Sequence, residues 1–307
     1  MKTSALIASI IKEEPVNRIG ALKKIGTISA IQRIVLTFQR AGVEDIYIIS
    51  NREDILKKEI SRQCITFIPA EIKDKETDMF SFVKLGLQYL QSKVDGLFIM
   101  PSNVPLFTAD TIKKLEESHE MITIPMSREI SGHPIRINAK AIPEILSYEG
   151  GQGLVGAVKS LEYEIKKVEV GDSGVVVYET SNEKFQDALM NHSLNELHPE
   201  VRVRIGKEMP FLGPGTRQLL SLLNENGSLR MTCEYMGISY SKGRGMLEIM
   251  EKQLGYEVVI RKTGGETGGS TTLTTKGADL LKRYQEYEKK VREYAEDIFK
   301  EYFFEVP

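Results

Sequence analysis

Hydrophobic positions over the first 190 residues follow two alternating patterns. Short, nearly continuous apolar runs predict buried strands at 5–11, 45–50, 65–70, 97–100 and 121–126. Between these runs, apolar residues recur at spacings of three and four, which predicts helices at 29–41, 54–63, 78–93 and 109–119. The alternation predicts an α/β fold, in which a mostly parallel sheet carries helices on both faces.

The pattern changes beyond residue 200. An alternating stretch predicts a strand at 201–205, and helical spacing predicts helices at 217–226, 228–236 and 239–254, followed by a long one from Lys276 to about Tyr302. The segments 257–262 and 270–275 flank a glycine-rich run and predict a hairpin. Two helices joined by a short turn that contains Gly237, with a hairpin behind them, indicate a winged helix-turn-helix domain.

A polar segment, NHSLNELHPE at 191–200, separates the two patterns. We therefore expect one domain at 1–190, a linker at 191–200 and a second domain at 201–307. A chain of 307 residues is long enough for two domains of about 100–200 residues each.

Composition excludes several classes of protein and favours none of the rest. Charged residues make up 27% of the chain, hydrophobic residues 41%, and the net charge is −2. Cys64 and Cys233, the two cysteines, are far apart, so we expect no disulfide framework and a cytoplasmic location. The first apolar run is too short to span a membrane, and the four histidines lack the spacing of metal ligands.

The stretch LFIMPSNVPLF, residues 97–107, combines a predicted buried strand with a polar loop. In open α/β sheets, ligands bind just beyond the carboxyl ends of the strands. A carboxylate in this loop could hold a magnesium ion beside a nucleotide phosphate. The polar side chain best placed there is Asn103, whose neutral amide is a poor substitute.

Several motifs of the first domain resemble those of MobA-like nucleotidyltransferases, the molybdenum-cofactor group of the sugar-phosphate nucleotidyltransferases. RIGALKK (18–24) resembles the signature R-[MF]-G-x-x-K; SFVKLGLQYL, PSNVPLF, SGHPIRI and EGGQGL resemble four further motifs. The resemblance implies a Rossmann-like nucleotidyltransferase sheet. It also implies a set of nucleotide-binding positions, namely Arg18, Gly20, Lys23, Ser81, Asn103 and His133. A solvated basic turn is the alternative for Arg18 and Lys23, and a histidine bonded to the backbone is the alternative for His133.

The departures from that family concern the residues of the reaction. The family's short loop, A-G-G-x-S-x-R, is replaced by a longer segment without glycine that adds Glu13 and Glu14. Asn103 stands at the position of the metal-binding Asp, and only Glu179, or less favourably Asp172, could serve as the second acidic residue. We therefore expect a degenerate domain with no catalytic residue and no metal site, and the sequence leaves its cofactor unknown.

Residues of about 205–290 resemble the winged helix of ModE-type, LysR-related regulators. The resemblance rests on GPGTRQLLSLLNENGSLR, GISY at the turn, the glycine-rich wing and LTTKGADLL, although Arg244 stands where that family usually has tryptophan. It implies a DNA-binding homodimer, and 15 basic against 10 acidic residues over 201–290 agree with phosphate binding. The candidate DNA-binding residues are Ser239, Tyr240, Ser241, Lys242, Arg244, Arg261, Lys262 and Thr263. A three-helix domain that merely contains a glycine turn is the alternative, and two glycines in the proposed recognition helix lower its helix propensity.

The last predicted helix carries an apolar and aromatic stripe at spacings of three and four. Its members are Tyr284, Tyr287, Val291, Tyr294, Ile298 and Tyr302. At about 1.5 Å per residue the helix is roughly 40 Å long, more than a small domain needs, so we expect a dimer contact rather than packing on its own domain alone. We find no counterpart of the ModE family's molybdate-binding domains after it and expect the first domain to sense any effector.

The sequence supports three hypotheses about function. The first is a cytoplasmic transcriptional regulator that binds double-stranded DNA as a homodimer, whose degenerate first domain senses a nucleotide, a pterin-type cofactor precursor or another phosphorylated molecule, with no membrane partner. The second is an active nucleotidyltransferase, using Mg²⁺ with CTP or GTP, that carries a DNA-binding domain. The third is a structural adaptor with an empty pocket.

Overall fold

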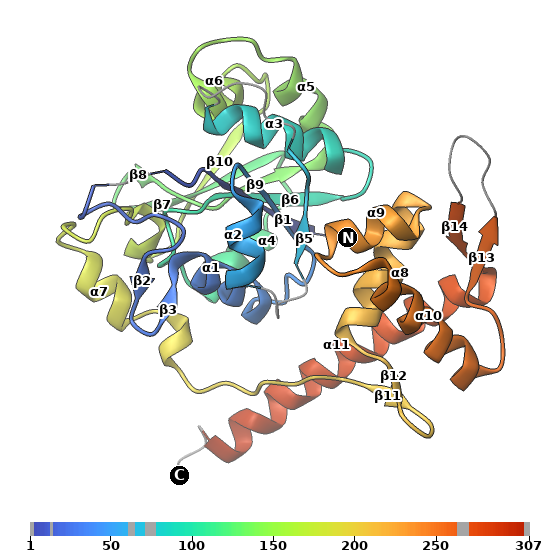
Figure 1. Cartoon of the computed structure of the whole chain (residues 1–307). Helices are drawn as coiled ribbons and strands as arrows, with labels where there is room; N and C mark the ends of the chain where they lie inside the picture. The colour runs from blue at the N-terminus through green and yellow to red at the C-terminus, as the bar shows by residue number, and fades with distance from the viewer. Residues whose placement is uncertain (1–2, 13–14, 61–64, 71–77, 263–269, 304–307) are drawn as a thin grey trace. The chain divides into compact units, whose positions relative to one another are not determined.

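The computed structural model describes residues 3–12, 15–60, 65–70, 78–262 and 270–303. These form two compact units, which divide the chain into residues 1–196 and 197–307 (Figure 1). The division falls inside the segment expected as a linker. Glu13, Glu14, Cys64, Thr263 and the glycine-rich tip of the predicted hairpin lie outside the described residues.

The first unit is built on a sheet with strand order β10-β7-β9-β6-β1-β4-β5, and β8 pairs with β7. The strands are β1 (Thr3–Ser9), β4 (Ile46–Ser50), β5 (Thr66–Phe67), β6 (Gly96–Pro101), β7 (Ile122–Ser127), β8 (Ile130–Ser131), β9 (Ile135–Asn138) and β10 (Ile165–Glu169). Strand β1 pairs in parallel with both β4 and β6, whereas β9 runs antiparallel to its two neighbours. The prediction of a mostly parallel sheet is confirmed.

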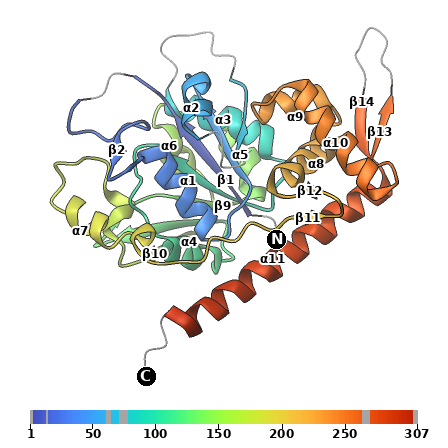
Figure 2. The same ribbon diagram turned by 60° about the horizontal axis from the view of Figure 1, so that its bottom comes forward.

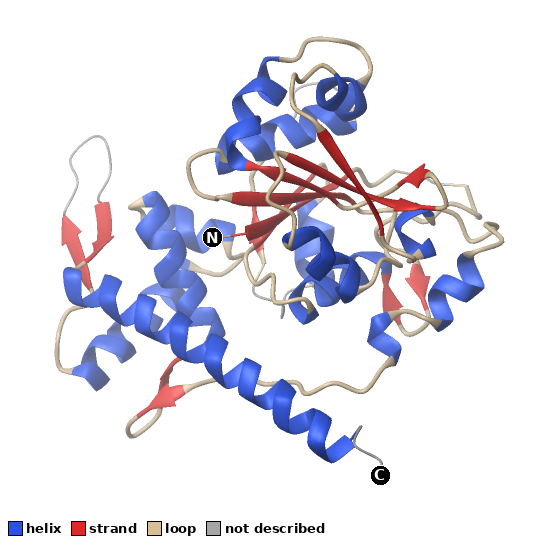
Figure 3. Cartoon of the chain, turned by 180° about the vertical axis from the view of Figure 1, so that it is seen from behind, coloured by secondary structure: helices blue, strands red, loops and turns tan. Residues whose placement is uncertain are grey.

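Helices cover both faces of this sheet (Figure 3). One face carries α1 (Ala30–Arg40), α2 (Glu53–Glu59) and α4 (Ala109–Glu116); the other carries α3 (Met79–Leu90), α5 (Ile142–Ser147) and α6 (Gly153–Lys159). Each face holds its own apolar core, which explains why the strand β1 is apolar at successive positions rather than at alternate ones. Shorter elements complete the unit: β2 (Lys24–Ile25), β3 (Ile28–Ser29) and α7 (Phe185–Met190).

Local capping sets where the helices begin. The Ser29 side chain accepts a hydrogen bond from the Gln32 amide at the start of α1, and Asp78 and Thr108 cap α3 and α4 in the same way. The predicted helix at 54–63 is shorter, because α2 ends at Glu59, and the predicted strand at 65–70 keeps two paired residues.

The first residues of the expected linker belong to the first unit. His192 is fully buried, its Nδ1 accepts a hydrogen bond from the Leu194 amide at 3.1 Å, and the same atom lies 3.3 Å from Arg33 Nη1. Burial, reinforced by the charge of Arg33, lowers the pKa of His192 to about 3, so the ring is neutral. Although the segment is polar in composition, His192 fixes its beginning to the first unit. The second unit starts only at Leu197.

The second unit has three short helices, α8 (Pro214–Asn226), α9 (Leu229–Tyr235) and α10 (Tyr240–Leu254). Two antiparallel strands, β13 (Val259–Lys262) and β14 (Ser270–Leu273), follow them, and a small ladder of β11 (Ile205–Gly206) and β12 (Pro210–Leu212) precedes them. The predicted strand at 201–205 is wrong for its first four residues. There the Val203 carbonyl accepts a hydrogen bond from the Tyr284 hydroxyl at 2.9 Å instead of pairing with a strand.

The final helix, α11 (Thr275–Phe303), joins the core of the second unit through its first half. Its inward residues Tyr284 and Glu288 are buried, and Glu288 forms an ion pair with Arg217 of α8 in which both side chains are about 5% exposed. Figure 2 shows the rest of α11 continuing past the other helices of its unit. Tyr294 and Tyr302 there are 67% and 78% exposed. The predicted stripe is therefore divided, because Tyr284 packs internally. No helix in the described ranges is long and apolar enough to cross a membrane.

Candidate functional site

The carboxyl ends of β1, β4 and β6 meet at one edge of the first unit's sheet. Ser9 pairs with Ser50, and Ala8 pairs with Pro101, so the three strands end at the same edge of the sheet. The long segment that replaces a glycine-rich loop starts here after β1, and Asn103 follows β6. This is the edge at which open α/β sheets bind ligands.

Residues 15–20 form a strap across this edge, held to the segment 178–181. The Ile19 amide donates to the Tyr178 carbonyl at 3.1 Å, and the Thr180 amide donates to the Asn17 carbonyl at 2.8 Å. Arg18 and Glu179 form an antiparallel bridge between the two segments.

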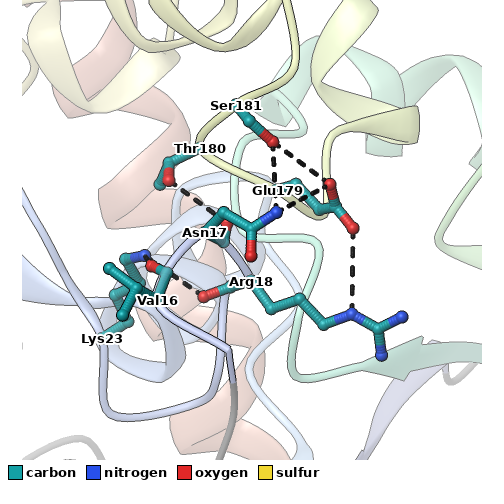
Figure 4. A network of polar contacts seen from close by, with 7 residues as sticks. All are labelled: Val16, Asn17, Arg18, Lys23, Glu179, Thr180 and Ser181. Atoms are coloured by element: carbon teal, nitrogen blue, oxygen red, sulfur yellow. Dashed lines mark hydrogen bonds and ion pairs between the residues drawn. The ribbon is translucent and has the colours of Figure 1, made fainter.

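The basic side chains of Arg18, in the strap, and Lys23, just after it, bind oxygen atoms of the protein itself (Figure 4). The Lys23 ammonium donates to the carbonyls of Val16 and Arg18, the latter at 3.2 Å. Arg18 Nε lies 3.8 Å from Glu179 Oε1, and the other oxygen of that carboxylate accepts from Ser181 Oγ at 3.2 Å. Arg18 and Lys23, two of the predicted nucleotide-binding residues, thus stabilise the strap.

Two cavities lie near this edge of the sheet. The first, of about 290 Å³, is lined by Arg18, Gly20 and Lys23 together with the residues that follow β1. The second, of about 580 Å³, is lined by Asn103 and His133 among others. Five of the six predicted nucleotide-binding residues are therefore near a cavity, but they are divided between two.

Ser81, the sixth predicted residue, lines neither cavity. Its amide and its hydroxyl both donate to Asp78 Oδ1, at 2.7 and 2.9 Å. It therefore belongs to the N-terminal cap of α3.

His133 is held by the main chain of neighbouring segments. Its amide donates to the Val175 carbonyl at 2.9 Å, and its imidazole is hydrogen-bonded to the main chain of Ile99. Burial lowers the pKa of His133 to about 4, so the ring is neutral at pH 7. Its Nδ1 has no hydrogen-bond partner among the described residues.

The donor atoms at this edge do not fit a magnesium ion. Asn103 offers a neutral amide, and the carboxylate of Glu179 is engaged in the strap. Asp172 Oδ2 accepts from the Thr108 amide at 2.8 Å, and its Oδ1 accepts from the Gly174 amide at 2.8 Å, so it holds the start of α4. Across the described ranges, no three His, Cys, Asp or Glu side chains come together in a group that could hold a metal.

The second unit presents a different surface, at the start of α10. The Ser239 side chain caps this helix by accepting from the Lys242 amide at 3.2 Å, and Tyr240 in the first turn is 53% exposed. The turn before it contains Gly237 at a φ of 63°, a left-handed conformation that favours glycine. Gly243 lies where α10 crosses α9: a Cβ there would stand 2.3 Å from Cys233 Sγ.

The predicted basic residues of this surface are not equivalent. Arg244 Nε binds Glu248 Oε1 at 2.6 Å on the exposed face of α10. Arg261 Nη2 instead binds Glu251 Oε2 at 2.8 Å, while the other oxygen of Glu251 accepts from the Val258 amide. Glu251, which sequence reasoning did not single out, therefore ties β13 to α10 and holds Arg261 in that joint. Lys262 is exposed on β13.

Comparison with known protein families gives a match within the first unit. Residues 21–167 match the model of the MobA-like NTP transferase domain. The chain contains a MobA-like NTP transferase domain. The match starts just after Arg18 and Gly20, so it covers the strands from β4 onwards and Asn103 but neither β1 nor the strap.

Individual proteins give weaker likenesses. The Transcriptional regulator ModE of Haemophilus influenzae is 33% identical over 79 residues, which are 26% of this chain; the chain matches about a third (31%) of that protein's length. A nucleotidyl transferase from Methanothermobacter is 13% identical with a TM-score of 0.50, over 62% of this chain and 98% of that one. A 4-diphosphocytidyl-2C-methyl-D-erythritol synthase from Anaerococcus prevotii is 12% identical with a TM-score of 0.47, over 61% of this chain and 94% of that one. The likeness to the Methanothermobacter protein describes the fold alone.

Proposed function

We propose that this protein is a DNA-binding transcriptional regulator of the ModE and LysR type, whose nucleotidyltransferase-like unit binds a small effector. The observation that carries the proposal is the exposed first turn of α10. This turn follows α9, is capped by Ser239, and belongs to a helix that is followed by the β13–β14 hairpin. This is the order of elements in a winged helix-turn-helix domain, in which the second helix enters the major groove.

The chemistry of α10 agrees with this role. Tyr240, Ser241 and Lys242 are exposed in its first turn and offer an aromatic ring, a hydroxyl and an ammonium group. Arg244 is exposed one turn further along the helix. The name of the Haemophilus influenzae relative, a transcriptional regulator, supports the same function.

The first unit acts as the sensor in this proposal. Its larger cavity, of about 580 Å³, falls in the range of small-molecule sites. Asn103 and Ser131 line it with an amide and a hydroxyl that could bind the polar edge of a nucleobase or pterin ring. The family of this unit and the ModE likeness both suggest a link to molybdenum cofactor metabolism.

Binding of the full chain to fragments of its source genome tests the DNA-binding part. We expect a small set of fragments to bind preferentially, with an affinity that falls as salt rises because cations are released from the phosphates. Lys242→Ala should weaken binding to all of them, whereas Lys166→Ala, an exposed change in β10 of the other unit, should not. Equal binding to every fragment would contradict the proposal.

The exposed half of α11 supports a homodimer. Tyr287, Tyr294 and Tyr302 are 52%, 67% and 78% exposed, which is a large aromatic surface for an isolated helix end. Sedimentation equilibrium should give twice the chain mass of 34.6 kDa. Tyr294→Glu, together with Tyr302→Glu, should shift it towards the single-chain mass.

A thermal-shift screen tests the sensor. A ligand that binds only the folded state raises the midpoint by mass action. Nucleoside triphosphates and pterins are the probes, and the native chain is compared with Asn103→Leu. A shift that the variant loses supports the larger cavity as the effector site, and a shift that both proteins share places the ligand elsewhere.

The match to a MobA-like NTP transferase domain favours a second function, nucleotidyl transfer from CTP or GTP. In that case Arg18 and Lys23 would have to leave the oxygen atoms of the strap and bind a triphosphate. Release of pyrophosphate from CTP or GTP with magnesium would establish it. If the native chain is inactive and Asn103→Asp is active, the native protein is not an enzyme of this kind.

A further inference from the structure

Arg244 and Glu248 form an exposed pair in the middle of the proposed recognition helix. Resting on the proposed DNA-binding function, we propose that Arg244 reads a guanine in the major groove, and that Glu248 is a positioning residue that holds its guanidinium group for this contact. The DNA site of the proposed regulator would then contain a guanine at a defined position.

The ion pair with Glu248 uses Arg244 Nε and leaves the two terminal nitrogens of the guanidinium group available. Arg244 Nε donates to Glu248 Oε1 at 2.6 Å, and no described residue is recorded as a partner of its Nη1 and Nη2. Those two nitrogens form a planar edge with parallel N–H groups, which matches the O6 and N7 acceptors of guanine. A carboxylate on Nε fixes the plane of the group before DNA arrives, which lowers the entropy lost on binding.

The position of Arg244 on α10 also supports a contact with DNA. Tyr240, Arg244 and Glu248 lie four residues apart and therefore share one stripe of α10. The side chains of Arg244 and Glu248 are 63% and 53% exposed. The next residue, Gly245, has open space where a side chain would be: among the described residues, no atom beyond its chain neighbours and the adjacent backbone of α10 lies within 4 Å of the Cβ position. A base pair can therefore approach the helix backbone beside Arg244.

Arg261 shows what a structural arginine of the same unit looks like. It binds its carboxylate through Nη2, so the planar edge that could read guanine is occupied. Its partner Glu251 is 15% exposed and also accepts from the amides of Val258 and Val259. Arg244 binds through Nε to a carboxylate that has no such main-chain partner recorded among the described residues.

The exposed carboxylate of Glu248 argues for a base and against a phosphate as the target of Arg244. An arginine that binds phosphate contributes through its positive charge, which displaces condensed cations. A neighbouring exposed carboxylate cancels that charge and repels the phosphate. The edge of a guanine is neutral, so the pair can bind it without this repulsion.

Selection of duplexes by the full chain from a random library, with quantitative competition, tests the proposal. We expect the native chain to select a guanine, and its replacement by adenine to weaken binding roughly 10- to 100-fold. Replacing the guanine by 7-deazaguanine, which lacks the N7 acceptor, should give a smaller loss. Arg244→Ala should bind the guanine and adenine duplexes equally.

Two further variants isolate the role of Glu248. Glu248→Ala should bind random duplex more tightly, because a negative charge is lost, yet discriminate less between guanine and adenine. Glu248→Gln keeps an acceptor for Nε and should retain most of the discrimination. Asp279→Ala, which breaks a matched exposed pair with Arg283 four residues away on α11, should leave discrimination unchanged.

The outcomes separate the inference from the function on which it rests. If the native chain binds no duplex preferentially, the proposed function fails and the inference fails with it. If the native chain selects a site but Arg244→Ala loses the same affinity for guanine and adenine duplexes, Arg244 contacts phosphate. The inference is then overturned, and the proposed function stands.

Discussion

The two units carry basic side chains in opposite arrangements. In the first unit, Lys23 and Arg18 lie beside a cavity at the ligand-binding edge of the sheet, but they bind carbonyls and a carboxylate of the protein. In the second unit, Lys242 and Arg244 are exposed on a helix, and the terminal nitrogens of Arg244 have no recorded partner within the described ranges. A basic residue near a candidate site is thus available to a ligand only through donors that the protein does not already bind.

The largest effect should come from Arg217, a basic residue of the second unit whose side chain is buried. Glu288→Ala leaves Arg217 buried without its carboxylate, and we expect the second unit to lose about 3–5 kcal/mol of unfolding free energy. Calorimetry of the full chain would show the change as a lowered transition temperature. Glu293→Ala, which breaks an exposed pair with Lys289, should change the unfolding free energy by less than about 0.5 kcal/mol.

Acid should weaken the first unit through its internal histidine. His192 has a pKa of about 3 when folded, against about 6.5 when unfolded, so below pH 6.5 only the unfolded chain takes up the proton. The contribution of the neutral His192 to the unfolding free energy is therefore fully present above pH 6.5. Below that pH it falls by about 1.4 kcal/mol per pH unit, which amounts to roughly 2 kcal/mol at pH 5. Urea titrations at several pH values measure this slope.

His192→Asn supplies the comparison for that titration. Asparagine keeps a side-chain acceptor for the Leu194 amide but cannot take up a proton. The variant should lose about 2 kcal/mol less than the native chain between pH 7 and pH 5. Equal losses in the two proteins would show that His192 does not control the response.

Close packing between α9 and α10 should stabilise the second unit and fix the position of the exposed face of α10. Gly243→Ala places a Cβ against Cys233 Sγ, and we expect a loss of about 1–3 kcal/mol. Cys233→Ala should recover most of that loss in the double variant. Gly245→Ala, where the space is open, should stabilise the helix by about 1 kcal/mol instead. A double variant as unstable as Gly243→Ala alone would place the strain elsewhere.

The smallest effect should come from replacing one lysine in each unit. Lys23→Met removes two hydrogen bonds to carbonyls and should destabilise the first unit by about 1 kcal/mol. Lys242→Met should leave the unfolding free energy unchanged, because its exposed ammonium has no recorded partner in the described part of the chain. Thermal unfolding measures both; similar losses would mean that the two lysines do not differ in kind.

Much of the fold could be predicted from local pattern. The runs that become β1, β4 and β6 are apolar because both sheet faces are covered, and the caps Ser29, Asp78, Thr108, Ser228 and Ser239 stand at the helix starts. The expected helices at 228–236 and 239–254 differ from the observed ones by one residue at their ends. These features depend on neighbours within a few positions, which the sequence displays directly.

The sites could be predicted only as residue types. Sequence motifs named Arg18, Lys23 and Asn103, yet gave no sign of the partners of the first two. Lys23 binds main-chain carbonyls, which every residue has, and Arg18 lies beside Glu179, 161 positions away. The tie between Arg261 and Glu251 was missed for a similar reason: ten residues and a turn separate them.

The sequence alone determined where helices and strands form, that the chain holds a MobA-like sheet, and which chemical groups stand near its edge. Only the tertiary structure decided that Lys23 binds carbonyls of the strap, that His192 is buried in the first unit rather than part of a linker, and that Arg244 keeps two donors available. Secondary structure follows from short-range periodicity, whereas the state of a donor depends on which oxygen atom the folded chain brings within its reach.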